Sequence, residues 1–183
     1  KTKPFGFLAF YPSAGAGGHC IPKDSTYLTF SAKKVGCALP IVEESIKTNL
    51  KIPLRVCDFI ESKLNELNIN NNRSVIVSGI SYKENTEDCR ESPGLKIASI
   101  LKERGINVKI HDSVVEHFPD GFEKIDNLDS ISNIKCICVV QYHKGTKAII
   151  EKIAESGKIN LLIDCKGQLE IKSNSKTRII QIY

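Results

Sequence analysis

The second half of the chain alternates short, continuous apolar runs with amphipathic segments of helical period, and this alternation limits the possible fold more than any other feature. Apolar runs predict strands at Ser74–Ile80, Ile106–His111, Lys135–Val140 and Leu161–Asp164, and an edge strand at Arg178–Ile182. Between them, helices are predicted at Ser92–Glu103 and Lys147–Glu155. Strands that are apolar on both faces and separated by helices form a parallel sheet covered on both sides. We therefore predict an α/β fold with a Rossmann-like parallel sheet and flanking helices.

A long amphipathic segment precedes this alternating region. Between Pro40 and Leu67 the apolar residues recur mostly three or four positions apart, which predicts one long helix, bent at Pro53. The polar stretch Asn68–Asn72 predicts a turn and a domain boundary. We therefore divide the chain into residues 1–68, the remnant of a helical domain, and residues 69–183, the Rossmann-like domain.

Residues 15–24 place one thiol between a glycine-rich loop and a predicted helix start. Proline is favoured at the first helical position, so Pro22 predicts a helix that begins about there. Cys20 then lies just outside the positive end of the helix, with Lys23 close behind it, and both features favour the nucleophilic thiolate form. Asp24, four residues after Cys20, is placed to handle a water or a proton at the same centre. The alternative is a plain loop–helix junction in which Asp24 complements the helix dipole.

The same loop imitates part of a dinucleotide-binding fingerprint. Gly15 and Gly17 follow the apolar run Phe5–Phe10, but Cys20 occupies the position of the third glycine. Polar residues also follow where the next helix should be apolar. The sequence therefore argues against a phosphate-binding loop of that type here.

The loop after the first predicted strand, residues 81–93, is the second polar feature. It carries two cations, Lys83 and Arg90. In an open α/β sheet, ligands bind at the carboxyl ends of the strands, and Lys166, after the fourth predicted strand, ends at the same edge. Arg90 at a helix N-terminus opposes the helix dipole, so it requires an anion from the protein or from a ligand. The alternative is a solvated loop whose own acids neutralise both cations: Glu84, Glu87, Asp88 and Glu91.

Composition sets the class of protein. With 41% hydrophobic and 26% charged residues, the chain has the profile of an ordinary soluble globular protein, and no apolar run is long enough to span a bilayer. The net charge of +5 is dispersed and suits an anionic small molecule at least as well as nucleic acid, so we predict no nucleic-acid and no membrane partner. Seven cysteines without a Cys-x-x-Cys pair indicate a reduced, cytoplasmic protein, and the separated histidines support no metal site. The absence of methionine indicates a piece of a longer protein.

The two polar loops together resemble the UDP-glucose/GDP-mannose dehydrogenase family. Its members carry a Gly-x-Gly-Gly-(His/Ser/Tyr)-Cys-x-x-x-Asp loop and, much later, a Tyr/Phe-Lys-x-(Asn/Asp)-Thr-x-Asp-x-Arg-x-Ser loop that opens the final domain. Here the first runs from Gly15 to Asp24 and the second from Tyr82 to Ser92, in that order. Asn49 and Pro53 also resemble the long central helix of the family. The resemblance covers most of the chain and implies the C-terminal portion of such an enzyme.

The resemblance implies an NAD-dependent oxidation of a nucleotide sugar at C6, from alcohol to uronate in two steps, in polysaccharide biosynthesis. Cys20 would attack the aldehyde-level intermediate to give a thiohemiacetal, whose oxidation yields a thioester. Water assisted by Asp24 would then release the uronic acid, so the thioester divides the second oxidation and the hydrolysis into separate steps.

The resemblance also implies which residues bind ligands. Lys23 would lie near NAD and the thiol, and Arg90 would reach the cofactor. The residues around the UDP-sugar would be Tyr11, Ser13, Gly15 and Gly17 in residues 1–68, and Tyr82, Lys83 and Lys166 in residues 69–183, the UDP-sugar-binding domain. Family members are dimers or larger assemblies, which implies a homodimer through the long helix near residues 41–67.

Two departures from the family pattern affect what the chain does alone. The NAD-binding domain with its glycine fingerprint and the upstream catalytic lysine are absent, so we expect this piece to be inactive by itself. Its Gly-Gly-His-Cys version is more similar to members that act on N-acetylated hexosamines than to the UDP-glucose enzymes. Two other functions stay open: a non-catalytic nucleotide-sugar-binding module, and a Cys–His acyl transferase that pairs Cys20 with His143 or His111.

Overall fold

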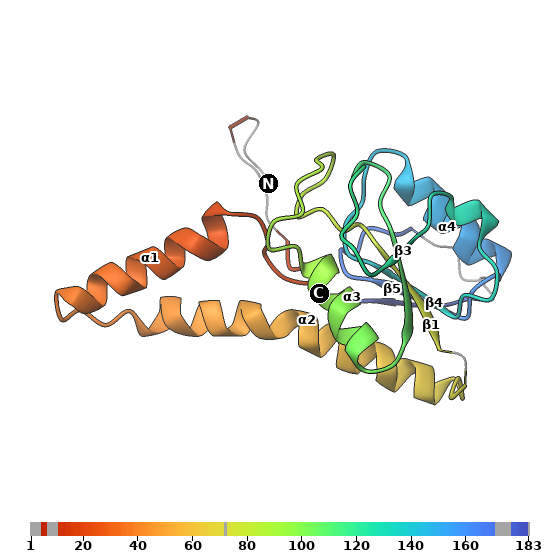
Figure 1. Cartoon of the computed structure of the whole chain (residues 1–183), viewed down its shortest axis with the longest axis horizontal. Coiled ribbons are helices and arrows are strands. Elements are labelled where there is room, and N and C mark those ends of the chain that lie inside the picture. The colour runs from red at the N-terminus through yellow and green to blue at the C-terminus, as the bar shows by residue number, and fades with distance from the viewer. Residues whose placement is uncertain (1–4, 7–10, 72, 171–176, 183) are drawn as a thin grey trace.

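The computed structural model of the chain describes residues 5–6, 11–71, 73–170 and 177–182. Figure 1 shows a sheet with helices on its faces and a pair of long helices that project from it. The projecting pair is α1 (Cys20–Lys34) and the first half of α2 (Pro40–Glu66), and the second half of α2 packs along the sheet domain. The apolar run 5–10 of the fingerprint-like segment lies mostly outside the described residues. None of the described helices is long and apolar enough to cross a membrane.

The sheet has six strands in the order β3-β2-β1-β4-β5-β6, and every neighbouring pair is parallel. The strands are β1 (Ser74–Ser78), β2 (Asn107–His111), β3 (Glu123–Lys124), β4 (Cys136–Val139), β5 (Leu161–Asp164) and β6 (Arg178–Gln181). The connecting helices are α3 (Pro93–Glu103), the short 3₁₀ helix η1 (Leu128–Ser130) and α4 (Thr146–Ser156). This confirms the predicted Rossmann-like parallel sheet, and it places the carboxyl ends of all the strands at one edge.

Two apolar layers enclose the sheet because successive side chains of a strand point to opposite faces. Val75 and Val77 of β1 belong to the layer packed by α2 and α3, whose buried members include Ile60 and Ile97. Ile76, between them in sequence, belongs to the opposite layer, which is packed by α4. All five residues of β1 are buried, so this strand is apolar-lined on both faces as its sequence predicts.

The predicted elements differ from the observed ones mainly at their ends. The strand predicted to reach Ile80 stops at Ser78, because the chain turns at Gly79, which has a φ of 87° and lies against the backbone of Gln141. The first helix begins at Cys20 rather than at Pro22, since His19 already has helical dihedral angles. Neither β3 nor η1 is predicted from the sequence; both are very short, and β3 consists of two exposed polar residues.

The remaining helix predictions are confirmed. The long helix extends over Pro40–Glu66, with Pro53 buried inside it, and the chain leaves it through Asn68 in the left-handed region at φ 57°. Helix α3 begins directly after Ser92, whose hydroxyl accepts a hydrogen bond of 3.2 Å from the Leu95 amide. These two helices pack against each other.

Candidate functional site

The two motif loops, far apart in sequence, meet at a pair of glycines. The amide of Gly18 donates a hydrogen bond of 2.9 Å to the carbonyl oxygen of Arg90. A Cβ atom on Gly18 would lie 2.7 Å from carbons of the Tyr82 ring, and one on Gly17 would lie 2.7 Å from the carbonyl oxygen of Glu91. Both glycines therefore let the backbone before Cys20 lie directly on the loop that opens the second domain.

The glycine loop is also fixed to α2. The Ala16 amide donates to Asn49 Oδ1 at 2.7 Å, and Asn49 Nδ2 donates back to the Ala16 carbonyl oxygen at 3.0 Å. Gly15 lies over Asn49 and Pro93, and the Ser13 hydroxyl donates to the Gly15 carbonyl oxygen at 3.3 Å. The double hydrogen bond to Ala16 explains a polar asparagine in the middle of a long helix.

Cys20 is the first residue of α1 and is exposed. The prediction that it lies just outside the helix is wrong by one position, but the thiol is still at the amino end of the helix. The guanidinium of Arg90 lies in its neighbourhood: Asp88 chiefly raises the pKa of Arg90, and Tyr82 and Cys20 contribute to the same direction. Asp24 lies in the same helix, four residues on, and its side chain is exposed.

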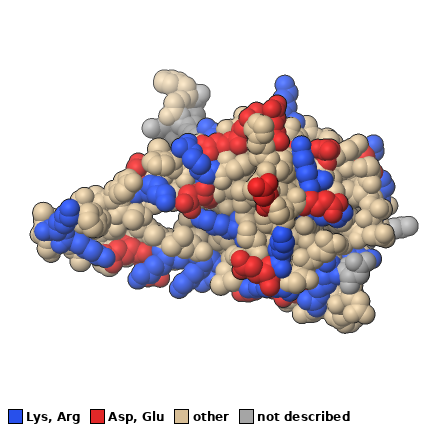
Figure 2. Space-filling model, in the orientation of Figure 1, with Lys and Arg blue, Asp and Glu red and all other residues tan. Residues whose placement is uncertain are grey.

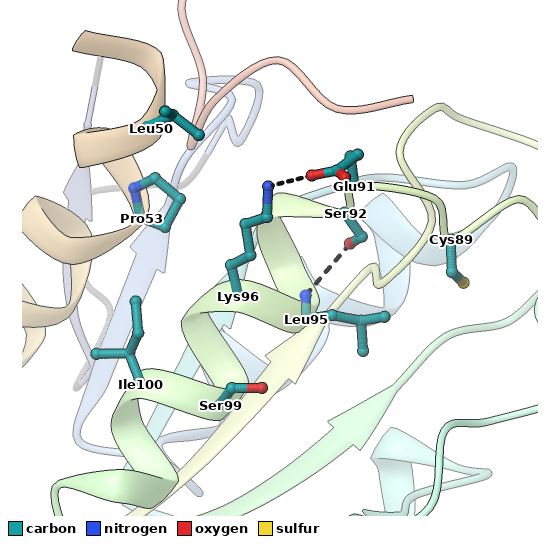
Figure 3. Close-up of a pocket in the computed structure, with 9 residues that line it drawn as sticks. All are labelled: Leu50, Pro53, Cys89, Glu91, Ser92, Leu95, Lys96, Ser99 and Ile100. Atoms are coloured by element: carbon teal, nitrogen blue, oxygen red, sulfur yellow. Dashed lines mark hydrogen bonds and ion pairs between the residues drawn. The ribbon is translucent and has the colours of Figure 1, made fainter. Parts of the chain in front are cut away.

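Lys23 has a partner in the loop before α3 that its sequence context does not reveal. Its Nζ lies 3.2 Å from Glu91 Oε1, and Glu91 Oε2 lies 2.7 Å from Lys96 Nζ of α3. Figure 3 shows the second of these ion pairs beside the Ser92 cap, in a groove of about 460 Å³ between α2 and α3. The hydrogen bonds from Lys96 and Lys23 lower the pKa of Glu91. Glu91 has a φ of 51°, which is uncommon for a residue with a side chain.

Arg90 receives its compensating anion from the protein itself. Asp88 contacts the guanidinium through both carboxylate oxygens, at 2.7 to 3.0 Å, and accepts the Arg90 amide at 2.9 Å. These hydrogen bonds lower the pKa of Asp88. Of the four acids in this loop, Asp88 and Glu91 therefore pair with cations of the site, and Arg90 remains largely exposed.

The other predicted ligand residues lie at the same end of the sheet. Lys83 is exposed and forms no ion pair within the part of the chain that the structure describes. Lys166 follows β5 and is half-buried; burial lowers its pKa, and Glu84 of the Tyr82 loop opposes this shift. Tyr11, which is exposed, and Ser13 precede the glycines on the first loop.

A buried carboxylate at the end of β2 is a part of this region that was not predicted from the sequence. Asp112 accepts hydrogen bonds from the amides of Ile80 and Ser81, at 2.8 and 3.2 Å, and from His143 Nε2 at 3.0 Å. Burial alone would raise the pKa of Asp112, but hydrogen bonds from His143 and from the amides of Val114 and Val115 outweigh it and hold this pKa at about 2. The only sequence signal was an acid placed directly after a buried strand.

Both histidines of the acyl-transferase alternative are buried, whereas the Cys20 thiol is exposed, which argues against either of them as its base. His143 is buried and bound on both ring nitrogens, to Asp112 and to the Asn85 amide. His111 is also buried and lies 2.9 Å from the Ser78 hydroxyl through Nδ1. Within the described residues, no group of three or more metal-ligating side chains gathers in one place.

Comparisons with known proteins agree with this arrangement. The family model for the UDP-binding domain of the UDP-glucose/GDP-mannose dehydrogenase family matches residues 76–171, and that for its central domain matches residues 1–51. The chain belongs to this family. The prediction made from the two loop motifs is therefore confirmed.

Relatives within the family carry several substrate names. The chain is 34% identical over 162 residues to a UDP-N-acetyl-D-mannosamine dehydrogenase of Methanococcus vannielii, which covers 86% of this chain and 36% of the relative. It is 26% identical to a UDP-glucose 6-dehydrogenase of Bacillus subtilis, over 86% of this chain and 35% of the relative. The chain thus spans little more than a third of the length of these family members.

Solved structures show the same fold. A UDP-D-ManNAc dehydrogenase from Pyrococcus horikoshii matches with a TM-score of 0.76 at 23% identity, over 93% of this chain and 40% of that chain. An NDP-N-acetyl-D-galactosaminuronic acid dehydrogenase from Methanosarcina mazei matches with a TM-score of 0.76 at 24% identity, over 94% and 39%. At this identity the likeness establishes the architecture of the family member, and its chemistry has to be argued from the site.

Proposed function

We propose that this chain is the C-terminal part of an NAD-dependent nucleotide-sugar 6-dehydrogenase that oxidises a UDP-hexose or UDP-N-acetylhexosamine to the uronate. The observation that carries the proposal is the contact between Gly17–Gly18 and Tyr82. It sets an exposed thiol at a helix amino terminus beside the ligand-binding edge of a domain matched by the UDP-binding model. The name of the Methanococcus relative favours an N-acetylated sugar within this class.

In this proposal Cys20 is the nucleophile. Its sulfur adds to the C6 carbonyl carbon of the aldehyde-level sugar, and the carbonyl oxygen takes up a proton to complete the thiohemiacetal. NAD, when bound, supplies the hydride acceptor for both oxidations. At the thioester stage, Asp24 accepts a proton from the attacking water, the C–S bond breaks, and the uronate leaves with the thiol restored.

The described residues fit only a part of an NAD site. Lys23 and Arg90 are partly exposed cations, but Glu91 and Asp88 already pair with them, so a negatively charged cofactor would compete with these two carboxylates. The turn after β1, however, does not offer its amides to a dinucleotide, because the carboxylate of Asp112 already accepts from Ile80 and Ser81. The main part of the cofactor site therefore belongs outside residues 1–183 in this proposal, and the chain alone is inactive.

The substrate side of the proposal uses the opposite loop. Lys83 is exposed and Lys166 is half-buried at the carboxyl edge of the sheet, so both can approach a diphosphate. Tyr82 closes the site against the glycine loop, and the residues lining the sugar are Tyr11, Ser13, Gly15 and Gly17. We place the boundary between the central-domain remnant and the UDP-sugar-binding domain at residues 68 and 69.

Site-resolved alkylation tests the proposal on this chain. Iodoacetamide labels exposed thiols, and Cys37 is a second exposed cysteine that serves as an internal reference. We expect UDP-N-acetylmannosamine to slow the labelling of Cys20 severalfold, because the sugar C6 lies over the sulfur, and to leave Cys37 unchanged. Equal labelling of Cys20 with and without UDP-N-acetylmannosamine, and with and without UDP-glucose, would contradict the site.

The catalytic role needs the full-length enzyme. There, Cys20→Ala is expected to abolish uronate formation while UDP-sugar affinity stays roughly intact, as for a residue that acts only on the reacting carbon. Normal turnover by this variant would favour the non-catalytic binding module instead. The cysteines of the described chain are all free, which fits a reducing cytoplasmic setting for the enzyme. A role in polysaccharide biosynthesis is proposed from the family resemblance alone.

A further inference from the structure

A histidine ring is one of the links between the sheet and the loop that carries Tyr82 and Lys83. The Asn85 amide donates to His143 Nδ1 at 2.9 Å, and His143 Nε2 lies 3.0 Å from the Asp112 carboxylate. Asn85 has a φ of 55°, and its side-chain oxygen accepts the Lys144 amide at 2.9 Å. The tip of the loop is therefore tied to the residues that follow β4.

The start and the end of the same loop are also hydrogen-bonded. The Ser81 hydroxyl donates to the Lys83 carbonyl oxygen at 2.8 Å, and the Tyr82 amide donates to the Asp88 carbonyl oxygen at 2.9 Å. Ser81 Oγ further lies 3.4 Å from His143 Nε2. The His143 ring thus lies between the carboxylate at the end of β2 and the loop that closes on Gly18.

These partners allow one tautomer of His143. A backbone amide can only donate, so Nδ1 must be an acceptor without a proton. A carboxylate can only accept, so Nε2 must carry the proton. The ring is therefore neutral, and its two nitrogens transmit the fixed position of Asp112 to the Asn85 amide.

We propose that His143 is a positioning residue for the nucleotide-sugar site: its neutral, Nε2-protonated ring joins Asp112 to the Asn85 amide and thereby fixes Tyr82 and Lys83 for the ligand. The inference rests on the proposed function for the identity of the ligand. The link itself is a property of the described residues and is testable without any ligand.

Two variants of His143 each keep one of the two hydrogen bonds that the ring makes. In His143→Asn the side-chain oxygen can take the place of Nδ1 and accept from Asn85, while the donor to Asp112 is lost. In His143→Gln the side-chain nitrogen can take the place of Nε2 and donate to Asp112, while the acceptor is lost. His111→Gln is the matched control, because it removes a buried histidine at the same strand end that does not contact the loop.

The exchange protection of the Asn85 amide measures directly whether the loop is held in place. At neutral pH we expect His143→Gln to lose protection at Asn85 about tenfold or more, with the Ile80 amide still protected by Asp112. His143→Asn keeps the acceptor but loses the hydrogen bond to Asp112, so it should lose less protection at Asn85 than His143→Gln, and His111→Gln should retain the protection of the wild type. Unchanged protection of Asn85 in His143→Gln, with the chain folded, would overturn the proposal.

A titration with UDP measures whether the position of the loop affects the affinity for the ligand. We expect His143→Gln to weaken UDP binding about tenfold, His143→Asn to weaken it less, and His111→Gln to bind UDP like the wild type. Comparing each variant with the wild type at the same pH cancels the titration of the phosphate itself. If exchange responds as expected but UDP affinity is equal in all four proteins, the loop link stands and its role in ligand binding is refuted. If the wild type binds no UDP while exchange responds, the proposed function fails and the link stands.

Discussion

At the scale of single residues, Glu91 joins the two parts of the site more directly than any predicted ligand residue does. Its carboxylate lies between Lys23 of α1 and Lys96 of α3, and its left-handed backbone sets its carbonyl oxygen over Gly17. Lys23 lies one helical turn after Cys20, and the Glu91 carboxylate holds its ammonium group. Glu91 therefore influences how closely the Lys23 ammonium approaches the Cys20 thiol.

Glu91→Gln tests this arrangement. Without the carboxylate, Lys23 is free to approach the sulfur three residues before it, and a nearby cation favours the thiolate. We expect alkylation of Cys20 at neutral pH to become about twofold faster, a small factor because Lys23 is 44% exposed and solvent screens it. Lys96→Gln is the control, since it leaves the Lys23–Glu91 pair in place. A Cys20 rate that does not change relative to Cys37 in Glu91→Gln would show that Lys23 does not act on the thiol.

At the scale of elements, the site depends on a loop lying against a loop rather than on a helix face or a strand. The glycine loop contacts Tyr82 without intervening side chains and is tied to α2 through Asn49. Such a contact tolerates no Cβ, so the requirement for glycine at Gly18 has two causes: its φ of 82° and its distance from the ring.

Gly18→Ala separates these two causes when it is compared with Gly36→Ala. Gly36 also has a positive φ, 74°, but no atom lies within 4 Å of the place that a Cβ atom would take there. Gly36→Ala therefore incurs backbone strain alone, about 1 kcal/mol, or a fall of about 2–4 °C in Tm for a chain of this size. We expect Gly18→Ala to lower Tm at least twice as far and to weaken UDP binding, because the Tyr82 ring must move. Equal Tm shifts for both variants, measured by calorimetry, would mean that the contact with Tyr82 gives way at no cost.

The turn after β1 is held by the Asp112 carboxylate, and this contact should make the stability of the chain depend on pH in acid. The pKa of Asp112 is about 2 in the folded chain and near 4 when unfolded, so the unfolded state binds the proton first. The resulting stabilisation is present above about pH 4 and is lost as the pH falls towards 2; it amounts to about 2 kcal/mol. We expect Asp112→Asn to be less stable than the wild type in urea unfolding at pH 7, with the gap narrowing below pH 4. A constant gap across this range would show that Asp112 is not the titrating group.

At the scale of the whole molecule, the parts of the fold that follow a repeating pattern could be predicted from the sequence. The strand Leu161–Asp164 is predicted with its exact ends, because a run that is apolar on both faces has to be buried along its whole length. Strand β3 could not be predicted, because its two exposed residues form a strand only by pairing with the edge of β2.

Some features of the candidate site could likewise be predicted from the sequence, and others could not. Cys20 and Arg90 are found from residue type and motif spacing. The Lys23–Glu91 and Asp112–His143 pairs join elements that only the folded sheet brings together, and no local pattern encodes them.

The projecting helices carry exposed apolar side chains. Figure 1 shows α1 and the first half of α2 extending away from the sheet, and Figure 2 shows basic, acidic and uncharged surface on this arm. Its exposed apolar side chains include Tyr27, Phe30, Val35 and Ile41, the last 82% exposed. An apolar surface of this kind is typical of an interface, and we propose that a second copy of the chain covers it through residues 41–67.

Sedimentation velocity of point variants tests this homodimer. We expect the wild type to sediment as a dimer and Ile41→Lys as a monomer, because a buried ammonium without a partner strongly opposes association. Ile149→Lys is the matched control: Ile149 is also an exposed apolar residue, at 39%, but it lies on α4, on the far layer of the sheet. It should leave the dimer intact. A wild type that stays monomeric up to its solubility limit would refute the homodimer, and an Ile41→Lys chain that still dimerises would place its interface elsewhere. Loss of the dimer in Ile41→Lys alone would assign to α2 a role in assembly besides its contacts with the glycine loop through Asn49.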